Sequence, residues 1–210
     1  MKKLGLLALL TLFKVQAAEL TVVDSQGQAL PNAVVWFKGE GSKQVALTAP
    51  QKYEMGQKQR SFVPHILVVP QGAEVDFPNF DNILHHVYSF SSSKAFELKL
   101  YRDKPHAPIR FDTSGIVELG CNIHDWMLGY IVVVDSPLFG VTDENGRWQG
   151  ELPFGEYQLK VWHERFQDLN TPEQLVWRLN AEQNQLRYQI KQQLMEKREV
   201  FSDELDGYED

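Results

Sequence analysis

The segment Gly115–Val134, GIVELGCNIHDWMLGYIVVV, reads as two short strands with a tight loop between them. In its first half, Val117 and Leu119 alternate with polar or small residues, and Cys121 continues their side of the pattern. Successive side chains of a strand point to opposite faces of a sheet. The alternation therefore predicts that the sulfur of Cys121, the chain's single cysteine, lies at the inner end of a buried strand.

Two further donor side chains lie in the predicted loop. His124 follows Cys121 by three residues, and Met127 follows His124 by three more. A loop of this length can curl a thiolate, an imidazole and a thioether around one point. These soft or borderline ligands favour copper over calcium, magnesium or manganese. Zinc is a rival metal, although methionine is not a usual zinc ligand. A buried, inert thiol is the alternative without a metal.

A thiolate copper site of this kind needs a second histidine. We expect it from another strand, because three ligands in one loop leave one side of the metal open. The segment Asn79–Phe90, NFDNILHHVYSF, offers His85 and His86 on opposite faces of a strand. Val87 shares a face with His85 and would pack inward beside it. We therefore assign His85 as the ligand and keep His86 as the alternative.

This order of residues resembles the ligand pattern of the cupredoxins, the superfamily of plastocyanin, amicyanin and pseudoazurin. In that family a V-x-F-x-N strand leads to H-N-V, and a later strand ends in Cys-x-x-His with a methionine shortly after. The residues that match here are Val75, Phe77, Asn79, His85, His86, Val87, Cys121, His124 and Met127. The resemblance covers Arg60 to Asp135 and implies one mononuclear copper held by His85, Cys121, His124 and Met127.

The resemblance also implies roles for residues around the ligands. His86 stands where many cupredoxins have an asparagine that ties the two ligand loops together, and a ring nitrogen of His86 could do the same. We expect Asn79 and Asn122 to support the ligands as well. Trp126, beside the ligand histidine, is either part of an apolar docking surface or a core aromatic residue.

The flanking segments resemble a second module. VVDSQGQALPNAVVWF (Val22–Phe37) and TDENGRWQGELPFGEYQLKVWH (Thr142–His163) are similar to the two halves of a carboxypeptidase-regulatory-like, transthyretin-like sandwich. The resemblance implies an all-β chain, with a cupredoxin Greek-key sandwich inserted in a smaller transthyretin-like β-sandwich. The boundaries we expect are residues 55–136 for the cupredoxin domain, and 19–50 with 137–191 for the second sandwich.

Two segments near the end of the chain have strand-like patterns. LVWRLN (Leu175–Asn180) and QLRYQI (Gln185–Ile190) are separated by polar residues, so we predict a hairpin, with one amphipathic helix as the alternative. Residues 192–210 form an acidic tail by composition.

The N-terminus has the pattern of an export signal. Two lysines precede an apolar run from Leu4 to Phe13, and small residues follow at Ala17 and Ala18. We predict a signal peptide over residues 1–18 and a periplasmic protein; an uncleaved anchor is the alternative. The formal net charge of −7 argues against a nucleic-acid partner. A single cysteine cannot form an internal disulfide, which favours Cys121 as a ligand.

Taken with the resemblance, these residues predict a non-catalytic type 1 copper protein that shuttles single electrons. By family analogy its partner is a c-type cytochrome or a dehydrogenase in the periplasm. The overall arrangement is similar to periplasmic proteins labelled as methylamine-utilisation proteins, although no residue indicates methylamine. Copper delivery and a metal-free interaction sandwich are the two alternative functions.

Overall fold

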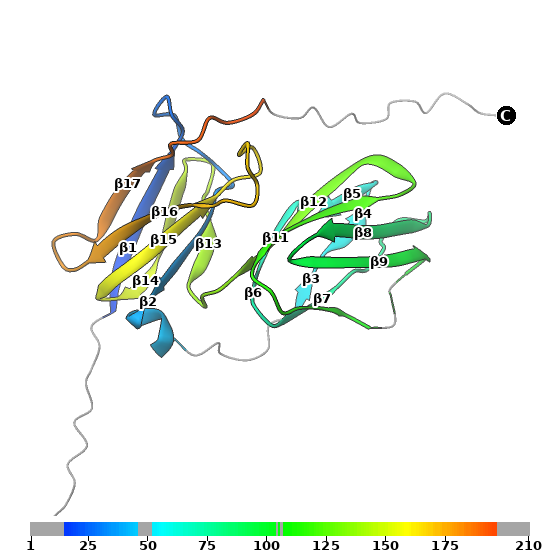
Figure 1. The fold of residues 1–210 in the computed structure, drawn as a ribbon, viewed down its shortest axis with the longest axis horizontal. Coiled ribbons are helices and arrows are strands. Elements are labelled where there is room, and N and C mark those ends of the chain that lie inside the picture. Colours follow the sequence, from blue (N-terminus) through cyan, green and yellow to red (C-terminus); the bar gives the residue numbers. More distant parts are fainter. Residues whose placement is uncertain (1–14, 46–51, 104, 106, 197–210) are drawn as a thin grey trace, which may run out of the picture.

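The protein is built almost entirely of strands, as a computed structural model shows for residues 15–45, 52–103, 105 and 107–196 (Figure 1). The one helix among these residues is a short 3-10 turn, η1 (Glu40–Gln44). The predicted all-β fold class is confirmed. None of the described helices is long and apolar enough to cross a membrane. Residues 1–14 of the predicted signal and 197–210 of the predicted tail lie outside the described residues.

The first and last parts of the chain share two sheets. One sheet has the order β14-β1-β17, and the other has the order β13-β2-β15-β16. β1 pairs with β14 antiparallel and with β17 parallel. The strands are β1 (Val15–Val23), β2 (Val34–Gly39), β13 (Phe139–Val141), β14 (Arg147–Pro153), β15 (Gly155–Trp162), β16 (Glu173–Leu179) and β17 (Gln185–Gln189).

The middle of the chain forms a second group of strands, on the right of Figure 1. Its main sheet has the order β6-β12-β11-β8-β9, and smaller sheets β10-β7-β3 and β4-β5 accompany it. The strands are β3 (Tyr53–Glu54), β4 (Gly56–Lys58), β5 (Ser61–Val63), β6 (Ile66–Pro70), β7 (Ala73–Asp76), β8 (His85–Ser91), β9 (Lys94–Tyr101), β10 (Ile109–Phe111), β11 (Gly115–Cys121) and β12 (His124–Val134).

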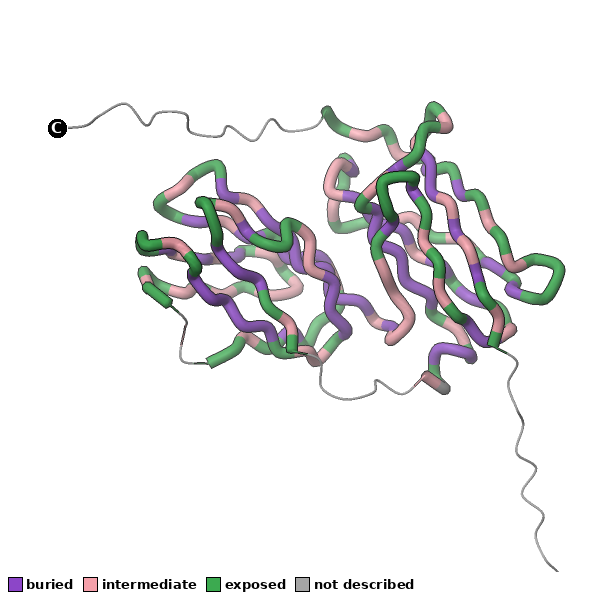
Figure 2. The backbone as a smooth tube through the Cα atoms, turned by 180° about the vertical axis from the view of Figure 1, so that it is seen from behind, coloured by how far each residue is buried: buried purple, intermediate pink, exposed green. Residues whose placement is uncertain are grey.

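Two apolar clusters fill the molecule, and Figure 2 shows the buried backbone running through both groups of strands. The first cluster lies between the sheets β14-β1-β17 and β13-β2-β15-β16, which together we call the outer sandwich. It also includes Tyr130, Val132 and Val134 of β12. Tyr130 meets Trp162 of β15 edge to face, with ring centroids 5.4 Å apart. The two groups of strands are therefore joined by buried apolar contacts. The second cluster lies inside the middle group and contains Cys121.

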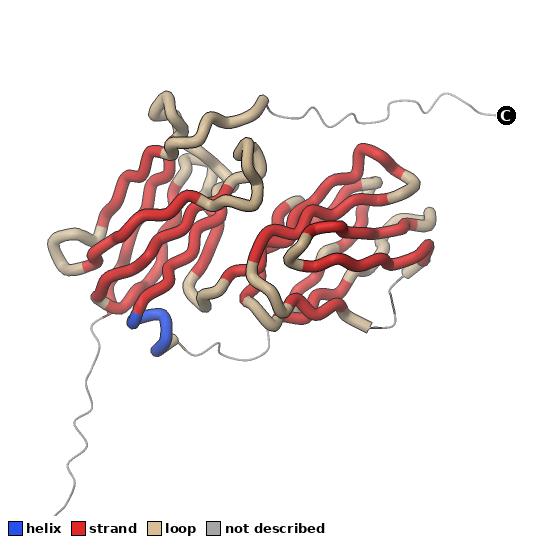
Figure 3. Tube along the Cα trace, in the orientation of Figure 1, coloured by secondary structure: helices blue, strands red, loops and turns tan. Residues whose placement is uncertain are grey.

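The predicted hairpin near the end of the chain is wrong in its pairing. Leu175–Asn180 and Gln185–Ile190 do supply the strands β16 and β17, with a loop between them (Figure 3). However, β16 pairs with β15, whereas β17 pairs with β1 in the other sheet. β16 thus pairs with the strand that precedes it, β17 pairs with the first strand, and the polar loop carries the chain from one sheet to the other.

A buried histidine predicts how the stability of this outer sandwich depends on pH. His163 is 4% exposed; its Nε2–H donates to the Pro31 carbonyl, and its Nδ1 accepts from the Arg165 N–H. Desolvation lowers the pKa of this ring below 6.5, so the fold favours the neutral form. The stabilisation is complete above the unfolded pKa and is lost as the pH falls through that value toward the lower folded pKa.

Glutamine keeps a donor and an acceptor at this position but does not titrate. We therefore expect the Tm of His163→Gln to fall less than the Tm of the unchanged protein when the pH is lowered from about 7 to about 5. Thermal unfolding at several pH values measures this difference. Parallel curves for the two proteins would contradict the assignment of His163 as a buried neutral ring.

Candidate metal centre

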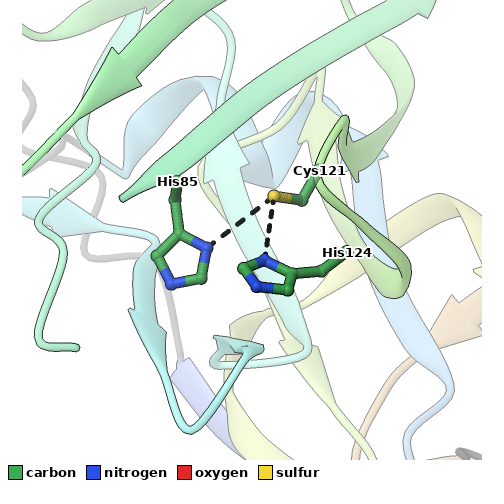
Figure 4. A group of neighbouring side chains, drawn as sticks. All are labelled: His85, Cys121 and His124. Carbon is green, nitrogen blue, oxygen red and sulfur yellow. Dashed lines mark hydrogen bonds between the residues drawn. The ribbon is translucent and has the colours of Figure 1, made fainter. Parts of the chain in front are cut away.

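Three neighbouring strands of the main sheet bring three donor side chains to one point. His85 begins β8, Cys121 ends β11 and His124 begins β12. The Cys121 sulfur lies 3.7 Å from Nδ1 of His85 and 3.5 Å from Nδ1 of His124, and both rings turn this nitrogen toward it (Figure 4). The three ligand atoms all lie within 4.8 Å of one another.

The turn between the two ligand strands is shorter than the loop the sequence predicts. Only Asn122 and Ile123 separate β11 from β12, so His124 is a strand residue that pairs with Cys121. The next pair joins Gly120 to Leu128, which leaves three residues of β12 without a partner on β11. This bulge includes Met127 and Trp126.

Of the two side chains named in this bulge, one points into the core and the other lies at the surface. Met127 is 3% exposed and belongs to the same buried apolar cluster as Cys121. Trp126 is 37% exposed, and its ring centroid lies 5.5 Å from that of His124. Of the two expected roles of Trp126, its exposure favours the surface one over the core one.

The two adjacent histidines have different surroundings. His85 is fully buried and shares the inner face of β8 with Val87, as the alternation predicts. Its Nε2 lies 2.9 Å from the Asp81 carboxylate. His86 faces outward, and its Nε2 lies 2.9 Å from the Glu97 carboxylate. The Asn122 N–H donates to the His86 carbonyl, so the backbone of His86, and not its ring, ties the two ligand strands together.

Asn79 supports the segment that leads to His85. Its side-chain amide donates to the carbonyls of Ile83 and Tyr101, and its oxygen accepts the N–H of Asp81. Asp81 is a site residue that the sequence analysis missed. Its only sequence signal is a position four residues before His85, which is too common a spacing to be informative.

The electrostatics of the site favour a neutral ring at His124. Desolvation lowers the pKa of His124 below 6.5, and the nearby guanidinium of Arg60 acts in the same direction. Metal-binding imidazoles must be neutral. The remaining histidines whose side chains the structure describes are used elsewhere: His65 pairs with Glu164, and His163 is hydrogen bonded in the outer sandwich. His106 lies outside the described residues.

The donor set fits copper. A thiolate, two imidazoles and a buried thioether combine the softness and the nitrogen donors that copper prefers. His85, Cys121 and Met127 are at most 3% exposed, so three of the four donors are shielded from solvent. The arrangement of His85, Cys121, His124 and Met127 points to copper binding.

The two adjacent histidines make a matched pair of variants. His85→Ala removes a buried donor, and we expect copper affinity to fall by more than about 100-fold, beyond the range for residues that only support a ligand. His86→Ala breaks an outward-facing pair with Glu97, and we expect less than about a tenfold change, because such pairs contribute little. Chelator competition measures both. Equal losses in the two variants would contradict the assignment of His85.

Comparison with known proteins gives a fold-level likeness only. No family model and no curated protein matches the chain. Among solved structures, a purple cupredoxin from Nitrosopumilus maritimus is 19% identical, with 40% of this chain and 100% of that chain covered and a TM-score of 0.35. Amicyanin from Paracoccus versutus is 16% identical, with 48% and 97% covered and a TM-score of 0.34.

The structural neighbours are cupredoxins. They also include a copper-containing nitrite reductase from Thermus scotoductus, 22% identical, with 54% of this chain and 28% of that chain covered and a TM-score of 0.38. These TM-scores are all below 0.5. The assignment of the metal therefore rests on the side chains of this chain, and not on the neighbours.

Proposed function

We propose that this protein is a cupredoxin-type electron carrier with one copper ion. The ligands we assign are His85, Cys121, His124 and, as a weak axial ligand, Met127. The observation that carries the proposal is the convergence of both Nδ1 atoms on one buried sulfur, at 3.7 Å and 3.5 Å. Bound copper would supply a one-electron couple at this point.

The chain's own residues supply rigidity and a route for the electron. The donors lie on three adjacent strands of one sheet, so their positions change little when the charge of the site changes. His85 is fully buried and offers no contact to a partner. His124 is partly exposed beside Trp126, and we assign this pair as the place where electrons enter and leave. The burial of the other ligands supports a carrier and not an enzyme with an open metal position.

We further propose that the protein works in the periplasm with a redox protein such as a c-type cytochrome or a dehydrogenase. The export-signal pattern of residues 1–18 supports this location. We also propose that residues 55–136 are a domain inserted into a second sandwich made of residues 19–50 and 137–191. The pairing of β1 with both β14 and β17 supports the insertion.

The test is the visible and EPR spectrum of the purified protein after one equivalent of Cu(II), followed by voltammetry and a chelator challenge. An intense charge-transfer band, a small copper hyperfine splitting and reversible one-electron redox with retained metal are expected. Rapid loss of copper to the chelator would replace the carrier function by delivery. A colourless protein with an ordinary copper signal, or with none, would overturn the proposal.

A further inference from the structure

The side chain of Asp81 is held by three hydrogen bonds beside the buried histidine. Its Oδ1 accepts the N–H of Gln59 at 2.7 Å, and its Oδ2 accepts the N–H of Arg60 at 3.0 Å. The same Oδ2 lies 2.9 Å from Nε2 of His85. The Asp81 side chain is 14% exposed and that of His85 is 0% exposed, so little water competes for this contact.

The two N–H donors come from an unusual turn. Gln59 and Arg60 join β4 to β5, and both have left-handed backbones, with φ of 53° and 54°. Two-residue hairpin turns with this conformation prefer Asn-Gly, because larger side chains are strained there. The strained turn points both of its N–H groups at one carboxylate. It therefore fixes the Asp81 side chain as an anionic acceptor.

The carboxylate determines how His85 presents its two nitrogens. A carboxylate accepts hydrogen bonds, so Nε2 of His85 must carry the proton. Nδ1 then has a free lone pair, and this is the nitrogen that faces the Cys121 sulfur. Both oxygens of the Asp81 carboxyl accept hydrogen bonds, two of them from backbone N–H groups, and such contacts favour the charged form of a carboxyl. The acceptor is therefore an anionic carboxylate.

We propose that Asp81 is a positioning residue, which fixes the tautomer of His85 and whose negative charge favours the oxidised state of the copper site. The effect of the Asp81 charge on the copper site rests on the proposed function, whereas the effect on the tautomer of His85 does not. A carboxylate behind a ligand imidazole makes that ligand more basic. A negative charge near the metal stabilises Cu(II) more than Cu(I), because the interaction grows with the metal's charge. The reduction potential is therefore lower than it would be without Asp81.

The variants separate the hydrogen bond from the charge. Asp81→Asn keeps the shape and an acceptor oxygen but removes the charge, whereas Asp81→Ala removes both. Asp125→Asn removes an exposed carboxylate that lies one residue from the ligand His124, without any hydrogen bond to a ligand ring in the described structure. Gln59→Asn keeps the N–H donor while placing a preferred residue in the turn. The last two variants are the controls.

The first measurement uses the metal-free protein. The ¹⁵N chemical shifts of His85 are expected to show one tautomer, with a slowly exchanging proton on Nε2, in the unchanged protein and in both controls. Asp81→Ala is expected to show a mixture of tautomers or a fast-exchanging proton. If Asp81→Ala does not fold, Asp81→Asn is still informative, because faster exchange of the Nε2 proton is expected there too. A His85 proton on Nδ1 in the unchanged protein would overturn the positioning role.

The second measurement uses Cu(II) and Cu(I) with competing chelators, together with voltammetry. Asp81→Asn is expected to bind Cu(II) about tenfold more weakly while binding Cu(I) nearly as before. A tenfold fall in the Cu(II) affinity relative to the Cu(I) affinity raises a one-electron potential by about 59 mV. Equal potentials for Asp81→Asn and the unchanged protein, or an equal rise in Asp125→Asn, would overturn the role of the Asp81 charge. Failure of the unchanged protein to bind copper would overturn the proposed function and the charge effect together, while the tautomer result would still decide the positioning role.

Discussion

Cys121→Ser is expected to remove the intense visible absorption of the copper-loaded protein completely. The band requires a thiolate bound to copper, and the chain has no other cysteine to supply one. A serine hydroxyl is a harder and far less acidic donor, so any remaining Cu(II) would be bound by the two imidazoles alone and would give an ordinary EPR signal. Absorption and EPR spectra at one equivalent of Cu(II) measure the loss.

Asn122→Ser is the matched control for this variant. It places the same new side chain one residue further along, in the exposed turn, where the donors are unchanged. We expect its spectrum to equal that of the unchanged protein, because Asn122 reaches His86 through its backbone N–H and not through its side chain. A band that survives in Cys121→Ser would show that the sulfur does not bind the metal.

Among these variants, Trp162→Ala is expected to lower the free energy of unfolding most. Trp162 is fully buried, its indole N–H donates to the Leu169 carbonyl at 2.9 Å, and its ring packs on Tyr130 of the middle strand group. Truncating a buried tryptophan costs about 3–5 kcal/mol in free energy of unfolding. Since the free energy of unfolding of a whole domain is only about 5–15 kcal/mol, this variant is expected to be close to unfolding. Urea denaturation followed by circular dichroism measures the change.

Phe90→Ala is the control for the loss of an aromatic ring. Phe90 is 85% exposed, so its removal is expected to change the free energy of unfolding by less than about 0.5 kcal/mol. A loss below about 1 kcal/mol in Trp162→Ala would contradict the tight packing between β12 and β15.

The features that the sequence predicts well depend on short-range periodicity. The two-residue period of a strand places Val117, Leu119 and Cys121 on one face, and all three are buried. The same period separates His85 from His86, and their burial and partners differ accordingly. Wherever a residue's orientation follows from its own strand, the pattern is sufficient.

The features that the sequence does not predict depend on which segments pair with one another in the folded chain. β16 and β17 have the expected strand patterns, but their partners lie in different sheets, and no local signal distinguishes this from a hairpin. Asp81 acquires its role only because the turn at Gln59 and Arg60 lies next to it in space. The start of β12 at His124 likewise follows from its pairing with Cys121.

The parallel pairing of β1 with β17 sets an order for assembly. Glu19 to Val23 align with Gln185 to Gln189, so one edge of β1 stays open until β17 has been synthesised. The strands around the candidate metal ligands lie between Tyr53 and Val134, and all of their pairing partners are available much earlier. Because distant pairings form late, the middle strands are expected to fold first on the ribosome or after translocation. The outer sandwich then closes beside middle strands whose candidate metal ligands are already in place.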